Sequence, residues 1–318
     1  MFFGKKNHLI GLDIGSRTIK VAEVVDTKTG STLKTFSSID IEPELIDGYS
    51  VIVKKINVQT MTEDELHETI HFEAEQYIPF DINDVNLDFQ ILGESEHNPN
   101  QMSVLLVAAK KEMVNEYINL VQMANLNTCI IDVDAFALQN IFEFNHTLED
   151  EHVALIDIGA SKTSLNILKG NSSAFMRDVS LGCAQINEKI VSLVDCSLEE
   201  AENIKFQQQS DIISLEDLKK IVSSVVADWC TEIKRALDFF YSTYPENQIT
   251  SFVLSGGGAN IKEFRHILAD ETSAEVEVIN PFKNFSADSS RFNASYLEKI
   301  APQAAICMGI AIRKIGDK

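Results

Sequence analysis

The sequence is short of basic residues and has no long apolar run. Its 318 residues contain 27 Lys and Arg against 48 Asp and Glu, a formal net charge of −21. Such a field repels polyanions, which argues against broad nucleic-acid binding. The longest apolar stretch, Val104–Ala109, is far too short to cross a bilayer, and the N-terminus lacks the apolar core of a signal peptide. We therefore expect contact with a membrane only through partners.

Paired cysteines are also missing. The five cysteines are scattered and form no CxxC pair: Cys129, Cys183, Cys196, Cys230 and Cys307. This pattern argues against a disulfide framework and against a zinc site, and it fits the reduced thiols of a cytoplasmic protein. His67 and His71 share one helix face, but no third zinc ligand accompanies them. A solvated helix face is the better interpretation of this pair.

Apolar residues make up 45% of the chain, enough to bury a substantial core in two domains or one bilobal domain. Thr62 and Glu65 predict a capped helix. Hydrophobic periodicity predicts the other elements as well. These are strands over 8–41, 49–58, 87–92 and 102–109; helices over 62–78 and 111–125; a strand turning helical over 129–144; a second meander over 152–179; helices over 182–194, 197–209 and 214–244; strand, turn and helix over 249–264; and a helix over 302–315.

One motif occurs twice. IGLDIGSRTIKVAEV (10–24) and ALIDIGASKTSLNIL (154–168) share two apolar residues, Asp-Ile-Gly, a short polar turn and an alternating strand. Each copy therefore predicts a hairpin with an aspartate at the end of its first strand. The repeat indicates a duplicated α/β fold whose halves open in the same way.

The first copy has the groups that bind phosphate. Gly15 permits a tight turn that uncovers backbone N–H groups, and these groups and the Ser16 hydroxyl can bind phosphate oxygens. Asp13 can hold hydrated magnesium, which prefers one or two carboxylates with phosphates and waters. Lys20, on the returning strand, can reach the outer phosphates. Since ordinary hairpins also use Asp, Gly and Ser, one copy is weak evidence.

Two copies are stronger evidence, because facing hairpins would grip a polyphosphate from both sides. A glycine-rich strand–turn–helix follows the second copy at Ser255–Ala259. The competing motifs GxxxxGK[ST] and GxGxxG are absent from the sequence. We therefore interpret the repeated turns as the two halves of a phosphate clamp.

These parts resemble the actin-like ATPase superfamily, which includes actin, heat-shock chaperones, sugar kinases and FtsA. The resemblance implies a duplicated actin-like (ribonuclease H-like) α/β fold, with two lobes around a nucleotide cleft and a small α+β insertion as in FtsA. The first lobe would comprise residues 1–48, 126–150 and 300–318. The insertion would comprise residues 49–125, and the second lobe residues 151–299.

Within the superfamily, EAEQYIPF (73–80) and DVDAFALQN (132–140) most resemble the PilM family of type IV pilus assembly. The resemblance implies a cytoplasmic scaffold, peripheral to the inner membrane, that binds ATP or ADP with magnesium. Its partner would be the N-terminal cytoplasmic tail of PilN, held in a groove near the insertion. PilO and the pilus motor ATPases would be indirect partners, and the chain would self-associate into a ring.

The resemblance also assigns site residues. On one side of the phosphates it places Asp13, Gly15, Ser16 and Lys20, and on the other Asp157, Gly159 and Ser161. Asp13 and Asp157 would hold magnesium, mostly through water. Gly182 would lie near the γ-phosphate, and Gly256 and Gly257 near the adenosine. Lys234 and Arg235 resemble a basic pair that packs on adenine, although a solvated helix face explains them equally well.

Three departures from the family pattern matter. Between residues 48 and 50 the insertion lacks a helix and a strand that the family usually has. Cys183 replaces a second glycine and either hinders phosphate approach or is a small buried residue. Asp132 stands where related filament ATPases carry Glu or Gln to orient water. Because Asp is one methylene shorter, we expect ATP binding with slow or no hydrolysis.

Two alternatives stay open. A small-molecule kinase of the same superfamily would need a base aspartate between the lobes, and no clear candidate is found. An FtsA-like filament protein would carry an amphipathic C-terminal membrane helix, which the ending AIRKIGDK does not resemble.

Overall fold

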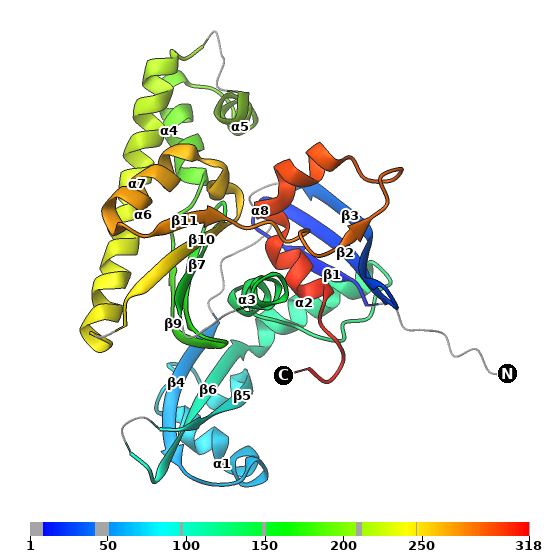
Figure 1. The fold of residues 1–318 in the computed structure, drawn as a ribbon, viewed down its shortest axis with the longest axis vertical. Coiled ribbons are helices and arrows are strands. Elements are labelled where there is room, and N and C mark those ends of the chain that lie inside the picture. Colours follow the sequence, from blue (N-terminus) through cyan, green and yellow to red (C-terminus); the bar gives the residue numbers. More distant parts are fainter. Residues whose placement is uncertain are drawn as a thin grey trace, which may run out of the picture. The chain divides into compact units, whose positions relative to one another are not determined.

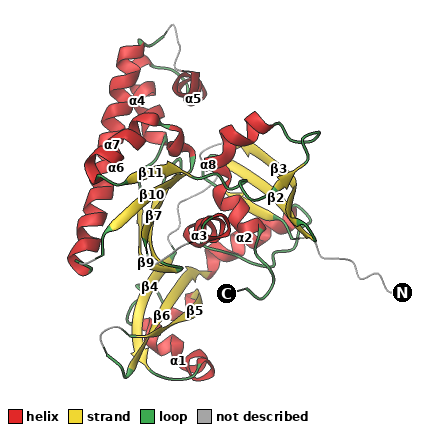
Figure 2. Cartoon of the chain, in the orientation of Figure 1, coloured by secondary structure: helices red, strands yellow, loops and turns green. Residues whose placement is uncertain are grey.

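The computed structural model describes residues 9–41, 51–95, 98–147, 151–207, 212–245 and 247–317. The chain divides into two compact units. The first comprises Met1–Ile46 and Asp134–Arg313, and the second Asp47–Val133 and Lys314–Lys318. Figure 1 labels the helices and strands along the chain, and Figure 2 separates them by type.

The first unit contains the predicted N-terminal meander. Its strands are β1 (Gly11–Ile14), β2 (Thr18–Thr27) and β3 (Gly30–Asp40), joined in antiparallel order. The short strand β12 (Ser286–Ala287) adds to β3 in parallel, giving the sheet order β1-β2-β3-β12. The Asp13 and Lys20 backbones are paired across β1 and β2, which puts both side chains on one face.

A second sheet of the same unit repeats this meander. Its strands are β7 (His152–Ile158), β8 (Thr163–Lys169), β9 (Ser172–Val179), β10 (Ile249–Ser255) and β11 (Glu275–Val278). The order is β11-β10-β7-β8-β9, with β10 parallel to both β7 and β11. Asp157 is paired with Ser164, as Asp13 is with Lys20. The repeated sequence thus gives a repeated hairpin, and β7 is buried almost throughout, as its unbroken apolar run indicates.

Helices α3 (Asp134–Asn145) and α8 (Ala294–Ala311) pack together between the two sheets (Figure 1). Gly309 allows the close approach, since a side chain there would collide with the backbone of Ala137. A buried apolar cluster joins these helices to both sheets, including Ala22, Leu33, Leu138, Ile141, Leu155, Val253, Cys307 and Met308.

The predicted helix over 302–315 differs from the structure. Helix α8 begins eight residues earlier, where the Asn293 side chain accepts hydrogen bonds from the Ser295 and Tyr296 backbones. Pro302 therefore lies inside the helix and not at its start, although proline lacks the N–H that a helix interior uses. The Pro302 carbonyl accepts the Gly256 N–H at 2.9 Å, which links α8 to the glycine loop after β10.

The remaining helices of the first unit cover the second sheet. They are α4 (Ala184–Val194), α5 (Leu198–Gln207), α6 (Leu215–Thr243) and α7 (Lys262–Thr272). Ser214 caps α6 by accepting the Asp217 N–H. The helical spacing is also confirmed, because Leu218, Val225, Trp229, Ile233, Leu237 and Phe240 are all buried in one cluster.

The second unit is a small α+β unit. Strands β4 (Ile52–Gln59), β5 (Val85–Glu94) and β6 (Gln101–Lys110) form an antiparallel sheet in the order β4-β6-β5. Helix α1 (Glu63–Glu75) starts with the predicted capping box of Thr62 and Glu65 and buries Leu66, Ile70 and Ala74. A short 3-10 turn, η2 (Ile82–Asp84), precedes β5, and helix α2 (Lys111–Met123) follows β6.

The strand expected at the start of 129–144 is wrong. Residues 126–133 form neither strand nor helix, and the helix begins at Asp134. Ile130, Ile131 and Val133 favour extended backbone, but a strand also needs a hydrogen-bonded neighbour. Among the described residues, no sheet includes this segment.

Candidate functional site

The first hairpin brings Asp13 and Lys20 into direct contact. The Gly15 N–H donates to the Thr18 carbonyl at 3.0 Å and closes the turn. The Lys20 Nζ lies 2.9 Å from Asp13 Oδ2, and both side chains are buried. Burial raises the pKa of Asp13, and the nearby Asp134 carboxylate raises it further, although Lys20 opposes both effects. Lys20 was expected at outer phosphates, whereas here it balances the aspartate charge.

The second hairpin holds Asp157 in an equivalent place. The Gly159 N–H closes this turn on the Lys162 carbonyl at 2.9 Å. Asp157 Oδ1 accepts a 2.6 Å hydrogen bond from the Ser255 hydroxyl at the end of β10. Burial raises the pKa of Asp157 to about 6, with Asp134 and Asp13 adding to the rise. A charge at Asp157 is therefore unfavourable unless a cation offsets it.

The two turns meet. The Ser161 hydroxyl donates to the Ser16 hydroxyl at 2.9 Å, although 145 positions separate them in the chain. Both serines belong to the first unit, whose two sheets thus present their repeated turns to each other. The groups that the sequence assigns to opposite sides of a phosphate chain therefore lie together.

Glycines press neighbouring loops against the second hairpin. Gly182, ahead of α4, lies on the Ala160 backbone so closely that any side chain would collide with its carbonyl. The next two N–H groups, of Cys183 and Ala184, donate to the Gly159 and Ala160 carbonyls at 3.0 and 2.8 Å. Gly182 thus lies on the turn where the sequence places the γ-phosphate.

Gly256 follows β10 with φ +80°, a left-handed conformation that favours glycine. A side chain there would strike the Ile158 backbone beside the second hairpin. Gly257 is different, since a Cβ atom there would meet only the Gln303 amide nitrogen, at 3.7 Å. The glycine loop thus lies next to the hairpin and has room at its second residue.

Cys183 has the character of a small buried residue. It is 7% exposed, and burial raises the pKa of its thiol to about 12. A Cβ atom at Gly258 would lie 3.4 Å from its Sγ, so the thiol packs against the glycine loop. This supports the second of the two interpretations offered for Cys183.

Asp134 was missed by the sequence interpretation, which chose Asp132. Asp134 lies in the first turn of α3, and its charge acts on both Asp13 and Asp157. Asp132 belongs to the other unit, where its side chain accepts the N–H of Val133 at 2.8 Å. The sequence did contain a signal for Asp134. It is the second aspartate of Asp-Val-Asp and comes directly before the apolar helix residues, and the helix dipole favours an acidic residue at a helix N-terminus.

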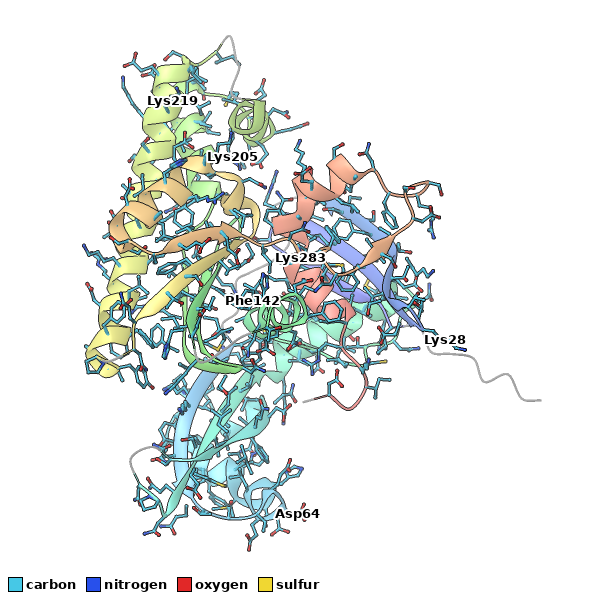
Figure 3. All side chains as sticks on the ribbon, in the orientation of Figure 1. Lys28, Asp64, Phe142, Lys205, Lys219 and Lys283 are labelled. Atoms are coloured by element: carbon cyan, nitrogen blue, oxygen red, sulfur yellow. The ribbon has the colours of Figure 1, made fainter. Side chains whose placement is uncertain are left out.

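The basic pair Lys234 and Arg235 lies on the exposed side of α6, and Arg235 pairs with Glu232 one turn earlier. An adenine contact for this pair stays a prediction. A second basic group, which the sequence interpretation did not select, is Lys205 on α5 (Figure 3). Its Nζ lies 2.8 Å from Glu202, and the charges of both act on the Cys183 thiol. Lys205 thus lies close enough to Cys183 for its charge to act on that thiol.

The carboxylates suit magnesium. Asp13, Asp134 and Asp157 influence one another, and Lys20 is paired with only one of them. In the part of the chain that the structure describes, no three acidic, His or Cys side chains converge tightly enough to hold a metal alone. Magnesium rarely needs such a cage, because it keeps several waters and uses phosphate oxygens.

The second unit has an open pocket of about 320 Å³. It is lined by Ile118 and Gln122 of α2 and by residues 127–131. The Thr128 hydroxyl is buried there without a hydrogen bond. Ile131, one of the lining residues, is 49% exposed. Large apolar side chains left in water around a pocket are typical of binding surfaces.

Across the described residues, no helix is both long and apolar enough to cross a membrane. Solved structures similar to the chain carry the same fold. The "PilM-PilN type IV pilus biogenesis complex" has TM-score 0.86 and 26% identity, covering 98% of this chain and 99% of that one. MreB5 of Spiroplasma citri bound to AMPPNP has TM-score 0.53 and 14% identity, covering 97% and 96%.

The ethanolamine utilization protein EutJ of Carboxydothermus hydrogenoformans is similar at TM-score 0.54 and 15% identity, covering 97% and 90%. These neighbours confirm the actin-like fold that the repeated hairpins indicated. The family described as "Type IV pilus assembly protein PilM" matches residues 45–315, most of the chain. The chain therefore belongs to the PilM family of type IV pilus assembly proteins.

Proposed function

We propose that the chain is an ATP-binding scaffold of the type IV pilus inner-membrane platform, and that it acts in the cytoplasm. The observation that carries ATP binding is the meeting of the two repeated turns, with Ser16 and Ser161 in contact. Each turn offers an aspartate, a glycine turn and a serine hydroxyl, the groups that bind a phosphate chain. The solved MreB5 structure bound to AMPPNP, with the same fold, adds support.

Magnesium fits beside Asp13 and Asp157, held mostly through water. When bound, it offsets the charge of the phosphates and of the two aspartates. Lys20 holds Asp13 in place, and Ser255 orients Asp157. Gly182 and Gly256 hold neighbouring loops close to the second turn, so that backbone approaches the phosphates.

We infer that hydrolysis is slow and that the residue orienting water is Asp134. Asp134 is a short side chain whose charge acts on both hairpin aspartates. Asp132, the candidate from the sequence, is the comparison: Asp134→Asn should slow turnover of Mg·ATP roughly tenfold or more, to a rate that can still be measured, and Asp132→Asn should leave the rate unchanged. The opposite outcome would restore Asp132 to the role.

The proposed partner is the cytoplasmic tail of PilN, since the similar solved structure is of a PilM–PilN complex. We place the tail at the pocket of the second unit, where an unsatisfied Thr128 hydroxyl lies among apolar side chains. A bound peptide would cover Ile131 and offer Thr128 a hydrogen-bond partner. PilO and the motor ATPases would then be reached through PilN, and ring formation would bring several copies together.

Two titrations test these proposals on the full chain. Fluorescent ATP with magnesium should bind saturably, and Asp157→Ala should abolish binding. The N-terminal tail peptide of PilN should bind the wild type, and Ile131→Glu should weaken binding at least tenfold. Phe72→Ser, which removes another exposed apolar side chain of the same unit, is the control and should leave PilN binding unchanged. Phosphoryl transfer to a sugar, without PilN binding, would favour the kinase alternative.

A further inference from the structure

Lys162, at the end of the second turn, lies between two carboxylates. Its Nζ is 3.2 Å from Asp134 Oδ2 and 3.4 Å from Asp178 Oδ2. Asp178, on β9, also accepts a 2.7 Å hydrogen bond from the Ser164 hydroxyl on β8. A continuous line of polar contacts therefore runs from the second sheet, through Lys162, to the first turn of α3.

Asp134 needs such a counter-charge. Its carboxylate acts on Asp13 and Asp157, and all three repel one another. Lys20 is paired with Asp13 and Ser255 with Asp157, whereas the half-exposed Asp134, without Lys162, would be able to turn toward solvent. The ammonium of Lys162 opposes that movement.

The charge of Lys162 is itself well supported. Burial lowers the pKa of Lys162, but Asp134 and Asp178 outweigh burial and raise it above its ordinary value. Lys162 is therefore a cation at any physiological pH. Since Asp178 is fixed by Ser164, the ammonium has one anchored partner and one partner that it can hold in position.

We propose that Lys162 is a positioning residue, which holds the Asp134 carboxylate beside the two hairpin aspartates with Asp178 as its anchor. This inference rests on the proposed ATP binding and on the proposed role of Asp134. Orientation of a water molecule is sensitive to small displacements, so loss of Lys162 impairs turnover and leaves nucleotide affinity unchanged.

A double-mutant cycle tests this on the full chain, with magnesium and ATP. We expect Lys162→Met to lower the single-turnover rate about tenfold, with the dissociation constant for ATP within about twofold of wild type. Lys162→Arg should keep most of the rate. In an Asp134→Asn background, Lys162→Met should have no further effect, because its target is gone.

Lys189→Met is the matched control. Lys189 is exposed to the same degree and also joins two polar groups, the Ser224 hydroxyl and Asp228, but on α6. It should change neither rate nor affinity.

Several outcomes would overturn the inference about Lys162 and leave the proposed ATP binding intact. These are an unchanged rate in Lys162→Met, additive losses in the Asp134→Asn background, a loss of affinity as large as the loss of rate, or wild-type turnover no faster than that of Asp134→Asn. A wild-type chain that does not bind Mg·ATP at all removes the proposed function itself, and the inference with it.

Discussion

Asp157→Asn is predicted to stabilise the protein in the absence of nucleotide. Folding moves the pKa of Asp157 from its ordinary 3.8 to about 6, mainly through burial. Each pKa unit is worth about 1.4 kcal/mol, so the ionised side chain lowers the free energy of unfolding by about 3 kcal/mol at pH 8. An amide removes this penalty and can keep the hydrogen bond with Ser255.

The direction of the pKa shift determines how the stability of the protein changes with pH. The native state binds the Asp157 proton more tightly than the unfolded state, so stability falls as pH rises from 3.8 through about 6. The gain from Asp157→Asn should therefore be about 3 kcal/mol at pH 8 and only about 1.6 kcal/mol at pH 5. For a unit of this size, the pH 8 gain corresponds to a rise in Tm of roughly 6–12 °C.

Urea unfolding at pH 5 and pH 8 measures both values, with Asp238→Asn, an exposed aspartate of α6, as the control that should change little. If magnesium and ATP bind as proposed, their addition should stabilise the wild type more than the variant. An Asp157→Asn protein that is less stable than wild type at pH 8, or whose gain does not depend on pH, would refute the reasoning.

Three further outcomes are expected. Gly256→Ala should lower the free energy of unfolding by about 2–4 kcal/mol and impair ATP binding, because the new methyl group meets backbone. Gly170→Ala is the control: this glycine has φ +54° but lies in open space, so the loss should be only about 1 kcal/mol when both variants are measured by thermal unfolding. Timed alkylation followed by mass spectrometry should modify the exposed Cys129 far faster than Cys183, and equal rates would contradict the burial of Cys183. Burial lowers the pKa of His152, so the native state binds fewer protons than the unfolded state, and stability should fall as pH drops below 6.5. His152→Asn should reduce this loss of stability, measured as the difference between urea unfolding at pH 7 and at pH 5.

Local sequence patterns predicted most of the fold. The repeated Asp-Ile-Gly turn, the capping box at Thr62 and the apolar spacing along α6 each depend on neighbours in sequence, and each appears in the structure. The strand expected from Cys129 failed because a ladder partner is a property of the whole sheet and not of the segment. Helix α8 began earlier than expected because Asn293 provides a cap and Pro302 is tolerated inside.

The candidate site could be predicted as far as its hairpins. Asp13 and Asp157 were selected because the motif recurs, whereas Asp134 and Lys162 are joined by a contact between elements far apart in the sequence. Asp132 and Asp134 occupy one short acidic stretch, and the sequence does not show that α3 begins at Asp134, so the interpretation named Asp132 alone. The charge of Asp134 on both hairpin aspartates comes from contacts across the fold, which residue types alone do not reveal.

The contact between Ser16 and Ser161 has a geometric consequence. Hydroxyl oxygens 2.9 Å apart leave no room for another oxygen between them. A phosphate oxygen that accepts from both would hold them roughly 5 Å apart, given ordinary hydrogen-bond lengths. A phosphate oxygen that binds between them must therefore break this contact, either by rotation of the serine side chains or by separation of the two turns that carry them.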